Sequence, residues 1–492
     1  MTPPSTRNIG LVLMILCMVC AMETLARITT NKRREKSNIN LCSKDIDMKL
    51  ACHCSHEDNR RTVMEVDCLV LHEEFPQSDP AWQSFRQHPN LKHFILTVHR
   101  NGYMSYLPSD ILKYQKELRT ITITYADIRE IPTYAFGNLT KLENITLIRS
   151  QIEVLDMHSF ANHESLRGLN LEENQIVDID RYAFTNLPEL QELLLTKNNL
   201  TTLHDEMFAD LGNLAKLKLN ENLISILTKE MFKGLGNLRQ LDLSINNVKY
   251  IGDAVFAELW SLQELDLESN SIERLSERAF DGLNNLRTLN LKNNKLETLE
   301  SGVFTGAPAV TSLYLDNNLL DTLTYSNVLP LMDNLVNHTS ILSLSGNTFV
   351  CDCRLNWMYD LRNRTKNIDL RRSLDKMVCS LDKSQYDPSK HTRSNNKYNF
   401  NHRNYNDDSD NYENELGPFD DLQKSIDGNA MIELRNINVE HLPCTEDLSD
   451  PTELPLSRES IGMDLSWLSG AGTCDFGLWV SIVGLTVCLL VA

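Results

Sequence analysis

The sequence lacks an excess of basic residues: 48 Lys and Arg stand against 67 Asp and Glu, giving a formal net charge of −19. Nucleic-acid phosphates are bound by clustered cations, so this balance argues against a nucleic-acid partner. The chain also has no glycine-rich phosphate loop and no convergent Ser/His/Asp or Cys/His motif. We therefore expect a protein that is not an enzyme and that uses no cofactor or metal.

Basic residues are also missing from the last segment, where small residues lead into a mostly apolar run from Phe476. A stop-transfer helix is usually flanked by Lys or Arg on its inner side. Small residues, a polar stretch and an apolar tail instead form the signal for a glycosylphosphatidylinositol (GPI) anchor. We expect attachment at Ser469 or Gly470, with Asp464 as an upstream alternative, and removal of residues 470–492. A tail-anchored helix is the competing interpretation.

The first residues carry the pattern of an export signal. Arg7 precedes an apolar run over residues 9–20, and Thr24-Leu25-Ala26 offers small residues at the positions that a signal peptidase reads. An uncleaved anchor is the alternative, but the run is short for crossing a bilayer. We expect residues 1–26 to be a cleaved signal peptide.

Cysteines are few and grouped. Of the twelve, Cys17 and Cys20 would leave with the signal peptide, and Cys474 and Cys488 with the tail. The other eight form two groups of four: Cys42, Cys52, Cys54 and Cys68, then Cys351, Cys353, Cys379 and Cys444. In an oxidising compartment these would form disulfides, although sequence alone leaves three pairings open in each group. A zinc site around the first group is the alternative, but the one-residue gap in Cys52-His53-Cys54 is shorter than structural zinc prefers.

A pattern L-x-x-L-x-L recurs every 24 residues from Leu118 to Val310, with looser units at Leu91 and Thr339. Such a fixed period indicates a solenoid. Asparagine stands at the ninth position of seven successive units: Asn174, Asn198, Asn222, Asn246, Asn270, Asn294 and Asn318. Phenylalanine stands at the nineteenth position of eight: Phe136, Phe160, Phe184, Phe208, Phe232, Phe256, Phe280 and Phe304.

Each recurring residue has a physical role, and these roles together define the leucine-rich repeat. Alternation in L-x-L buries two leucines of a short strand and exposes the residue between them, so stacked strands form one parallel sheet. Asparagine can both donate to and accept from backbone groups buried between coils. Phenylalanine builds a second apolar column. We predict an α/β solenoid, a leucine-rich-repeat horseshoe with a parallel concave sheet and about 11 repeats over residues 91–347.

From Cys42 to about Cys444 the chain resembles the extracellular leucine-rich-repeat family. The first cysteine group resembles its N-terminal cap, expected over residues 42–90, and GNTFVCDCRLNW resembles its C-terminal cap, expected over residues 348–444. Solenoids need such caps because their ends expose apolar core. The resemblance implies four pairings: Cys42 with Cys54, Cys52 with Cys68, Cys351 with Cys379, and Cys353 with Cys444.

Repeat number, paired caps and tail together resemble the lipid-anchored cell-adhesion members of this family. This resemblance implies homophilic recognition, in which the partner is the same protein on an opposing cell. It also implies a role in neural or neuromuscular development. A receptor or co-receptor subunit with a different protein partner is the alternative, and a matrix protein is disfavoured by the tail.

Two further segments differ from the repeats. An insert near residues 383–430 is rich in Asn, Asp and Tyr and has no apolar periodicity, which predicts a solvated, disordered loop. Residues 445–469 are polar and contain Pro451 and Pro455, a composition suited to a stalk above the membrane.

The outward strand residues are the candidate interaction face. A basic group of Lys197, Lys216 and Lys218 precedes an acidic group of Asp242, Glu264, Asp266 and Glu268. Two antiparallel molecules could oppose these groups about a two-fold axis. The alternative is an ordinary solvated face of mixed charge.

Glycosylation is expected on turns and exposed faces. Asn-x-Ser/Thr sequons occur at Asn138, Asn144, Asn199, Asn337 and Asn363. Asn144 is the third residue of its repeat and should point outward from the concave sheet. The histidines His158, His163 and His204 lie outside strand positions, so we expect them in solvent.

Overall fold

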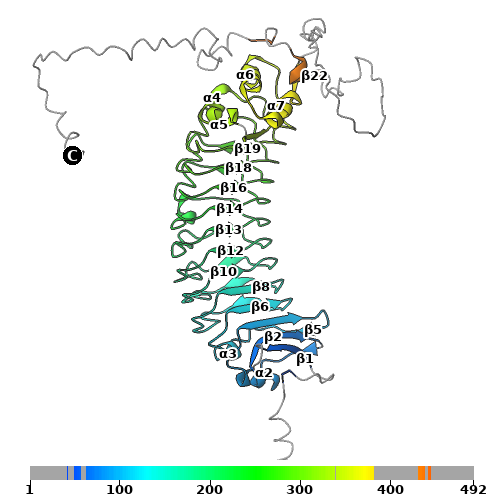
Figure 1. Cartoon of the computed structure of the whole chain (residues 1–492), viewed down its shortest axis with the longest axis vertical. Helices are drawn as coiled ribbons and strands as arrows, with labels where there is room; N and C mark the ends of the chain where they lie inside the picture. The colour runs from blue at the N-terminus through cyan, green and yellow to red at the C-terminus, as the bar shows by residue number, and fades with distance from the viewer. Residues whose placement is uncertain are drawn as a thin grey trace, which may run out of the picture.

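A computed structural model describes residues 41–42, 49–56, 62–71, 73–337, 339–381, 430–437 and 442–444. These residues form one stack of coils with a cap at each end (Figure 1). The predicted signal peptide, stalk, attachment residues Ser469 and Gly470, tail and most of the insert lie outside the described residues.

One long sheet runs along the stack. In spatial order its strands are β1 (Leu50–His56), β2 (Val63–Val70), β4 (His93–Val98), β6 (Thr120–Thr124), β8 (Asn144–Ile148), β10 (Gly168–Asn170), β12 (Glu192–Leu194), β13 (Lys216–Lys218), β14 (Gln240–Asp242), β16 (Glu264–Asp266), β18 (Thr288–Asn290), β19 (Ser312–Tyr314) and β20 (Ile341–Ser343). The β1–β2 pair is antiparallel and all later pairs are parallel. This is the parallel sheet that the repeats predict.

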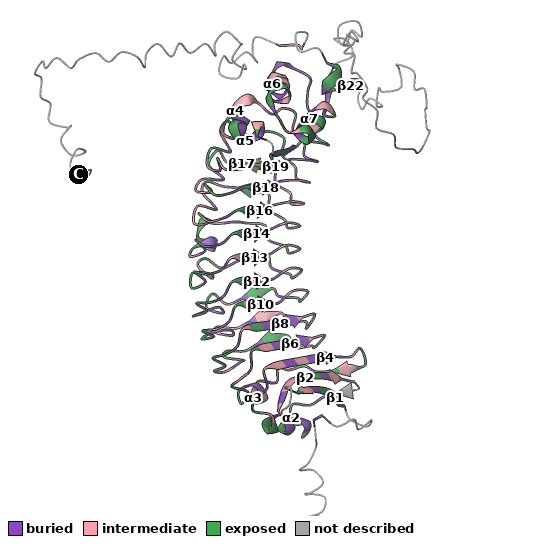
Figure 2. Ribbon diagram, in the orientation of Figure 1, coloured by how far each residue is buried: buried purple, intermediate pink, exposed green. Residues whose placement is uncertain are grey.

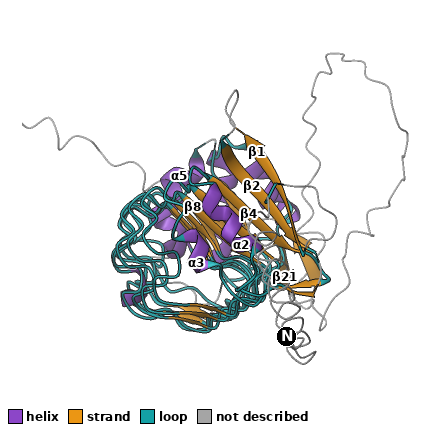
Figure 3. Cartoon of the chain, turned by 90° about the horizontal axis from the view of Figure 1, so that it is seen from below, coloured by secondary structure: helices purple, strands orange, loops and turns teal. Residues whose placement is uncertain are grey.

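The remaining strands are short and lie in the other parts of the coils or in the caps. They are β3 (Glu73–Glu74), β5 (Gly102–Tyr103), β7 (Glu130–Ile131), β9 (Val154–Leu155), β11 (Asp178–Ile179), β15 (Tyr250–Ile251), β17 (Arg274–Leu275), β21 (Val378–Leu381) and β22 (Ala430–Glu433). Strands β7, β9 and β11 form one small parallel sheet, and β15 and β17 form another. Viewed along the stack, successive coils superpose closely (Figure 3).

Helices are concentrated near the two ends of the described chain. The α-helices are α2 (Ala81–Ser84), α3 (Ser109–Leu112), α4 (Tyr325–Val328), α5 (Met332–Val336), α6 (Asn356–Arg364) and α7 (Ile368–Asp375). The 3₁₀ turns are η1 (Phe85–Gln87), η2 (Lys229–Phe232), η3 (Leu329–Leu331), η4 (Cys353–Leu355) and η5 (Leu434–Asn436). Helices α4 and α5 occupy the longer coil between β19 and β20.

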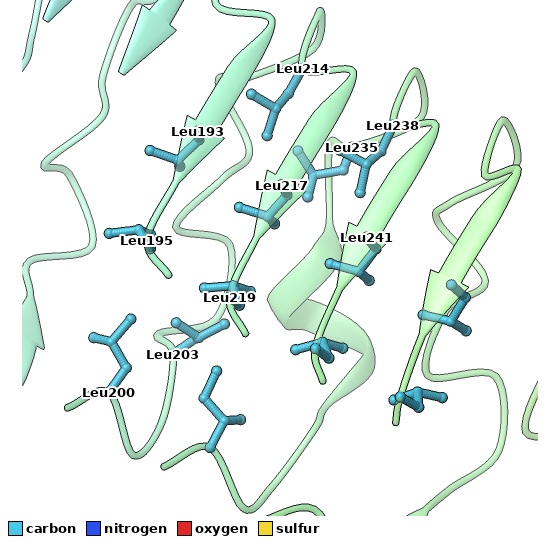
Figure 4. Packing of buried hydrophobic residues seen from close by; sticks show 14 of the residues in the cluster. Leu193, Leu195, Leu200, Leu203, Leu214, Leu217, Leu219, Leu235, Leu238 and Leu241 are labelled. Atoms are coloured by element: carbon cyan, nitrogen blue, oxygen red, sulfur yellow. The ribbon is translucent and has the colours of Figure 1, made fainter. Parts of the chain in front are cut away.

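The 24-residue period sets the register of the sheet. Leu193 pairs with Leu217, and Leu217 with Leu241, so equivalent leucines of successive coils stand side by side. All three are buried and point into the stack, as Figure 4 shows. The residues that alternate with them stay partly exposed on the concave face (Figure 2).

The asparagines join adjacent coils as predicted. In Asn246, Nδ2 donates to the carbonyl oxygens of Leu219 at 2.9 Å and Leu243 at 3.1 Å, while Oδ1 accepts the N–H of Ile224 at 2.9 Å. The same arrangement recurs at the other six asparagines of this position. Buried backbone groups of two coils are thereby satisfied by one side chain.

The phenylalanines form the predicted second column. Rings stack from Phe136 to Phe208 and again from Phe232 to Phe304, with centroids 5.4–6.5 Å apart. This spacing lies within the favourable range for aromatic pairs. The rings therefore fill the stack on the side opposite the inward leucines.

Disulfides close both ends of the solenoid. The N-terminal cap contains Cys42–Cys54 and Cys52–Cys68, and the C-terminal cap contains Cys351–Cys379 and Cys353–Cys444. These are the four pairings that the family resemblance implies. Because all eight sulfurs are bonded in pairs, the first group does not form the alternative zinc site.

Aromatic residues pack each cap onto the coils. In the N-terminal cap, Trp82 contacts Phe75 and Phe85, with ring centroids 5.2 and 5.4 Å apart. In the C-terminal cap, buried Trp357 donates its indole N–H to the carbonyl oxygen of Leu323 at 2.6 Å. The apolar ends of the repeat column are therefore covered.

Candidate interaction face

The centre of the concave sheet carries a charged hollow. Strands β13, β14 and β16 present Lys216 and Lys218, then Gln240 and Asp242, then Glu264 and Asp266. The hollow has a volume of about 400 Å³ and extends over Thr288, Asn290 and Tyr314 of the next two strands. Five of the seven residues predicted for the face lie in these three strands.

The two strand lysines differ in their partners. Lys216 Nζ lies 3.7 Å from Glu192 Oε1 of the preceding strand. For Lys218, no carboxylate of the described residues lies within ion-pair distance, although Asp242 is its register neighbour. A cation on Lys218 is therefore available to a group outside the molecule.

The acidic side is held by short hydrogen bonds. Gln240 Nε2 donates to Glu264 Oε2 at 2.7 Å. Asp242 Oδ1 accepts the Ser244 N–H at 3.1 Å and the Ser244 hydroxyl at 2.7 Å. These contacts hold the carboxylates in place but supply no positive charge.

Asp266 is a partly buried carboxyl of the hollow. Burial raises its pKa, hydrogen bonds from the Glu268 N–H and Asn290 oppose that rise, and the charges of Asp242 and Glu268 add to it. A cation brought into the hollow would favour the ionised form again.

Two predicted residues stand apart from the strand residues. Lys197 occupies the turn after β12 with φ 59°, and its Nζ lies 3.4 Å from Glu173, which also binds Arg149. Glu268 follows β16 and accepts hydrogen bonds from Asn290 and Asn293, each at 2.9 Å. Of the three lysines in the predicted basic group, only Lys216 and Lys218 therefore lie on a strand. Lys197 lies in a turn and pairs with Glu173.

The N-terminal part of the face contains the sequon at Asn144. Asn144 is exposed in β8 and points outward, as expected, and its register neighbour in β10 is Gly168. A Cβ on Gly168 would lie 2.5 Å from Asn144 Oδ1, so the glycine leaves room for the asparagine side chain. The other predicted sequon residues, Asn138, Asn199, Asn337 and Asn363, are also exposed.

One histidine prediction was wrong. His163 is 1% exposed and packs edge-on against Phe136, and burial lowers its pKa. It occupies the repeat position filled by Leu139 and Leu187, so the 24-residue period itself could have revealed its burial. His158 stacks on the Tyr134 ring and is partly buried, whereas His204 is exposed as expected.

Sequence reasoning also missed Trp260, which precedes β16 at the rim of the face. Its ring is 55% exposed and lies directly over Gly236 of the preceding coil. The available signal was the pair of glycines, Gly212 and Gly236, at the same position of the two preceding repeats.

Within the described ranges, no cluster of three or more His, Cys, Asp or Glu side chains is arranged to hold a metal ion. Among the same residues, no helix has the length and apolar character needed to span a membrane.

Comparisons with protein families identify the repeats. A family described as Leucine rich repeat matches residues 212–272 and 260–320, and one described as BspA type Leucine rich repeat region (6 copies) matches residues 105–229. Connectin of Drosophila melanogaster is 47% identical over 102 residues. That segment spans 21% of this chain and 15% of connectin.

Solved structures with similar coils include a chain of the Toll–Spatzle complex from Drosophila. It is 20% identical, covers 60% of this chain and 50% of its own, and has a TM-score of 0.47. A chain of the octameric complex of Latrophilin 3, Unc5D and FLRT2 is 20% identical, with 63% and 88% covered and a TM-score of 0.46.

Proposed function

Because the chain is a connectin-like leucine-rich-repeat protein, we propose that it is a cell-surface adhesion protein that binds a second copy of itself. The resemblance to adhesion members of the family supports adhesion, and a role in neural or neuromuscular development belongs to the same proposal. The disulfide-bonded caps support export to an oxidising compartment.

The order of charges about β14 is the observation that carries this proposal. Lys216 and Lys218 stand one strand before β14, and Glu264 and Asp266 stand one strand after it in the same two rows. A two-fold axis running along β14 turns one face onto another with the solenoids antiparallel. Lys216 then faces Glu264 of the second copy, and Lys218 faces Asp266.

This contact is self-complementary, as an isologous interface must be. Rotation about an axis along the stack would instead bring Lys216 opposite Lys218, so the charges favour the antiparallel arrangement. Glu268 has no part in the pairing, because its carboxylate is already bound by Asn290 and Asn293.

The same proposal includes attachment to the outer membrane leaflet through a GPI anchor at Ser469 or Gly470, after export by the signal peptide. Support comes from the small residues and apolar tail of residues 470–492. We also propose N-glycans at the five exposed sequons. A phosphatidylinositol-specific phospholipase should release the protein from intact cells, and retention on the cells would favour a tail-anchored helix.

A cell-mixing experiment tests self-recognition. Non-adhesive cells carrying the full chain are labelled in one colour and cells without it in another, and the composition of clusters is counted. Homophilic adhesion predicts clusters made only of expressing cells. Recruitment of non-expressing cells would instead indicate a receptor for a different ligand.

Charge reversal tests the proposed axis. K216E/K218E should raise the surface density needed for half-maximal clustering by about tenfold, since each exposed pair contributes up to ~1 kcal/mol and symmetry counts it twice. Mixing these cells with cells carrying E264K/D266K should restore clustering. K229E/K233E changes the same charge at exposed sites around η2 and should have no effect. Equal loss in mixed and unmixed populations would reject the axis.

A further inference from the structure

An exposed tryptophan marks the rim beside the charged hollow. Trp260 is 55% exposed although its carbonyl is fixed by Asn285, whose Nδ2 donates to it at 2.7 Å. The ring leans back one coil onto Gly236, where any side chain would collide with it. Large aromatic side chains left in water beside a candidate interface are typical binding hot spots.

A second hollow of about 510 Å³ lies on the same rim, over the coils of β12, β13 and β14. Its wall includes Asn213, Ala215, Asn237 and Arg239. Ala215 interrupts a row of long side chains, and the position of Gly212 has open space on its side-chain side. The short side chain of Ala215 therefore leaves space in the wall of the hollow, and Gly212 leaves space beside it.

The asparagines of this wall leave the hollow open. Asn213 Nδ2 donates to the Pro188 carbonyl oxygen and Asn237 Nδ2 to the Gly212 carbonyl oxygen, each at 2.7 Å. Each amide is thus bonded to the backbone of the preceding coil. A ring that contacts Ala215 would therefore leave both donors bonded, and the remaining lining residues, Glu189, Gln191 and Ser261, are polar.

The two-fold axis along β14 relates the two features. It places the coil of β16, which carries Trp260, opposite the coil of β13 in the second copy. Both Trp260 and Gly212 precede their strand by the same number of residues, so they lie on the same rim and meet there. In each copy the Trp260 ring leans onto Gly236 of the β14 coil. After the two-fold rotation, this ring therefore lies between the β13 and β14 coils of the other copy, where the hollow is.

We propose that the rim hollow at Asn213 and Ala215 receives Trp260 of a second copy, so that two such contacts flank the charged centre of the dimer. This inference rests on the proposed self-recognition and identifies its apolar anchor. A buried indole contributes large contact area at little conformational cost. The Arg239 guanidinium at the edge of the hollow can stack on the incoming ring.

Removal of the ring is the first test. Cells carrying the full chain with W260A should need at least about thirtyfold higher surface density for half-maximal clustering, the loss typical of a hot spot. Y250A is the matched control, because Tyr250 is similarly exposed at 52% but belongs to the short strand β15 in another part of the coil. Y250A should cluster as the wild type does.

Filling the hollow is the second test. A215W should also abolish clustering, because the new ring occupies the place of the partner's Trp260. The double variant A215W/W260A should recover part of this loss, since its filled hollow no longer meets a protruding ring. No recovery in the double variant would overturn the pairing of these two positions.

The outcomes separate this inference from the proposed function. If wild-type cells do not cluster, self-recognition itself fails. If the charge-reversal pair restores clustering while W260A clusters at wild-type density, the axis stands and the tryptophan contact is rejected. Surface density, measured by antibody on intact cells, shows in each case whether a variant folds and is exported.

Discussion

His163 places an imidazole in a row of the core that leucine fills in neighbouring coils. Its ring is buried against Phe136 and has a hydrogen bond with the Leu139 backbone, while its Nδ1 has no hydrogen-bond partner among the described residues. Burial lowers its pKa from 6.5, so below that pH the unfolded chain binds a proton more readily than the folded one. Protonation therefore favours unfolding, and the free energy of unfolding falls as pH drops from about 6.5.

We expect H163L to stabilise the protein by ~1 kcal/mol, because removal of the unpartnered Nδ1 outweighs loss of the hydrogen bond with the Leu139 backbone. It should also flatten the fall in stability between pH 6.5 and 5, measured by urea denaturation at several pH values. H204L alters an exposed histidine and should keep the wild-type slope. His88, whose pKa is also lowered by burial, contributes equally to both proteins. An unchanged slope in H163L would show that another group causes the pH dependence.

At the scale of the element, each ring of the phenylalanine column depends on its neighbours. Phe256 lies 5.7 Å from Phe232 and 6.5 Å from Phe280, centroid to centroid, and is fully buried. F256A would leave a cavity that the stacked coils cannot close, so we expect a loss of ~3–5 kcal/mol in a thermal or urea unfolding experiment. Y250A, which truncates an exposed ring of the same coil, should change stability by under ~1 kcal/mol. Equal effects would contradict a rigid column.

Strand positions and inward rows could be predicted because every repeat satisfies the same packing requirement, and one period sets them all. Lys197 shows what the pattern leaves open: positive φ recurs at this position in every coil from Arg149 to Asn317, but the ion pair of Lys197 with Glu173 depends on the residue that the preceding coil presents. The position of the Trp260 ring over Gly236 likewise follows from a contact between two coils, which no single repeat reveals.

At the scale of the whole molecule, the regular register of the strands places the lysines of β13 and the carboxylates of β16 symmetrically about β14. This arrangement makes the surface complementary to a second copy of itself. The repeat period predicts which residues share a row, so the opposition of lysines and carboxylates was visible in the sequence. The axis was not, because it depends on which side chains are already bound. Glu268 is held by two asparagines, whereas Lys218 lacks an ion-pair partner among the described residues. Those differences favour β14 as the centre of the proposed contact.

An axis along β14 brings Asp242 opposite its own copy, so two like charges meet at the middle of the contact. D242N keeps the oxygen that accepts hydrogen bonds from Ser244 and removes this repulsion. We expect half-maximal clustering at a surface density about three- to tenfold lower than wild type.

The gain should shrink as salt is added, because ions screen the repulsion that the substitution removes. D205N neutralises an exposed aspartate that accepts a hydrogen bond from Thr228, away from the strands of the concave sheet, and should leave clustering unchanged. Weaker clustering in D242N would mean that Asp242 faces a cation of the partner, and the axis would then have to pass between other strands.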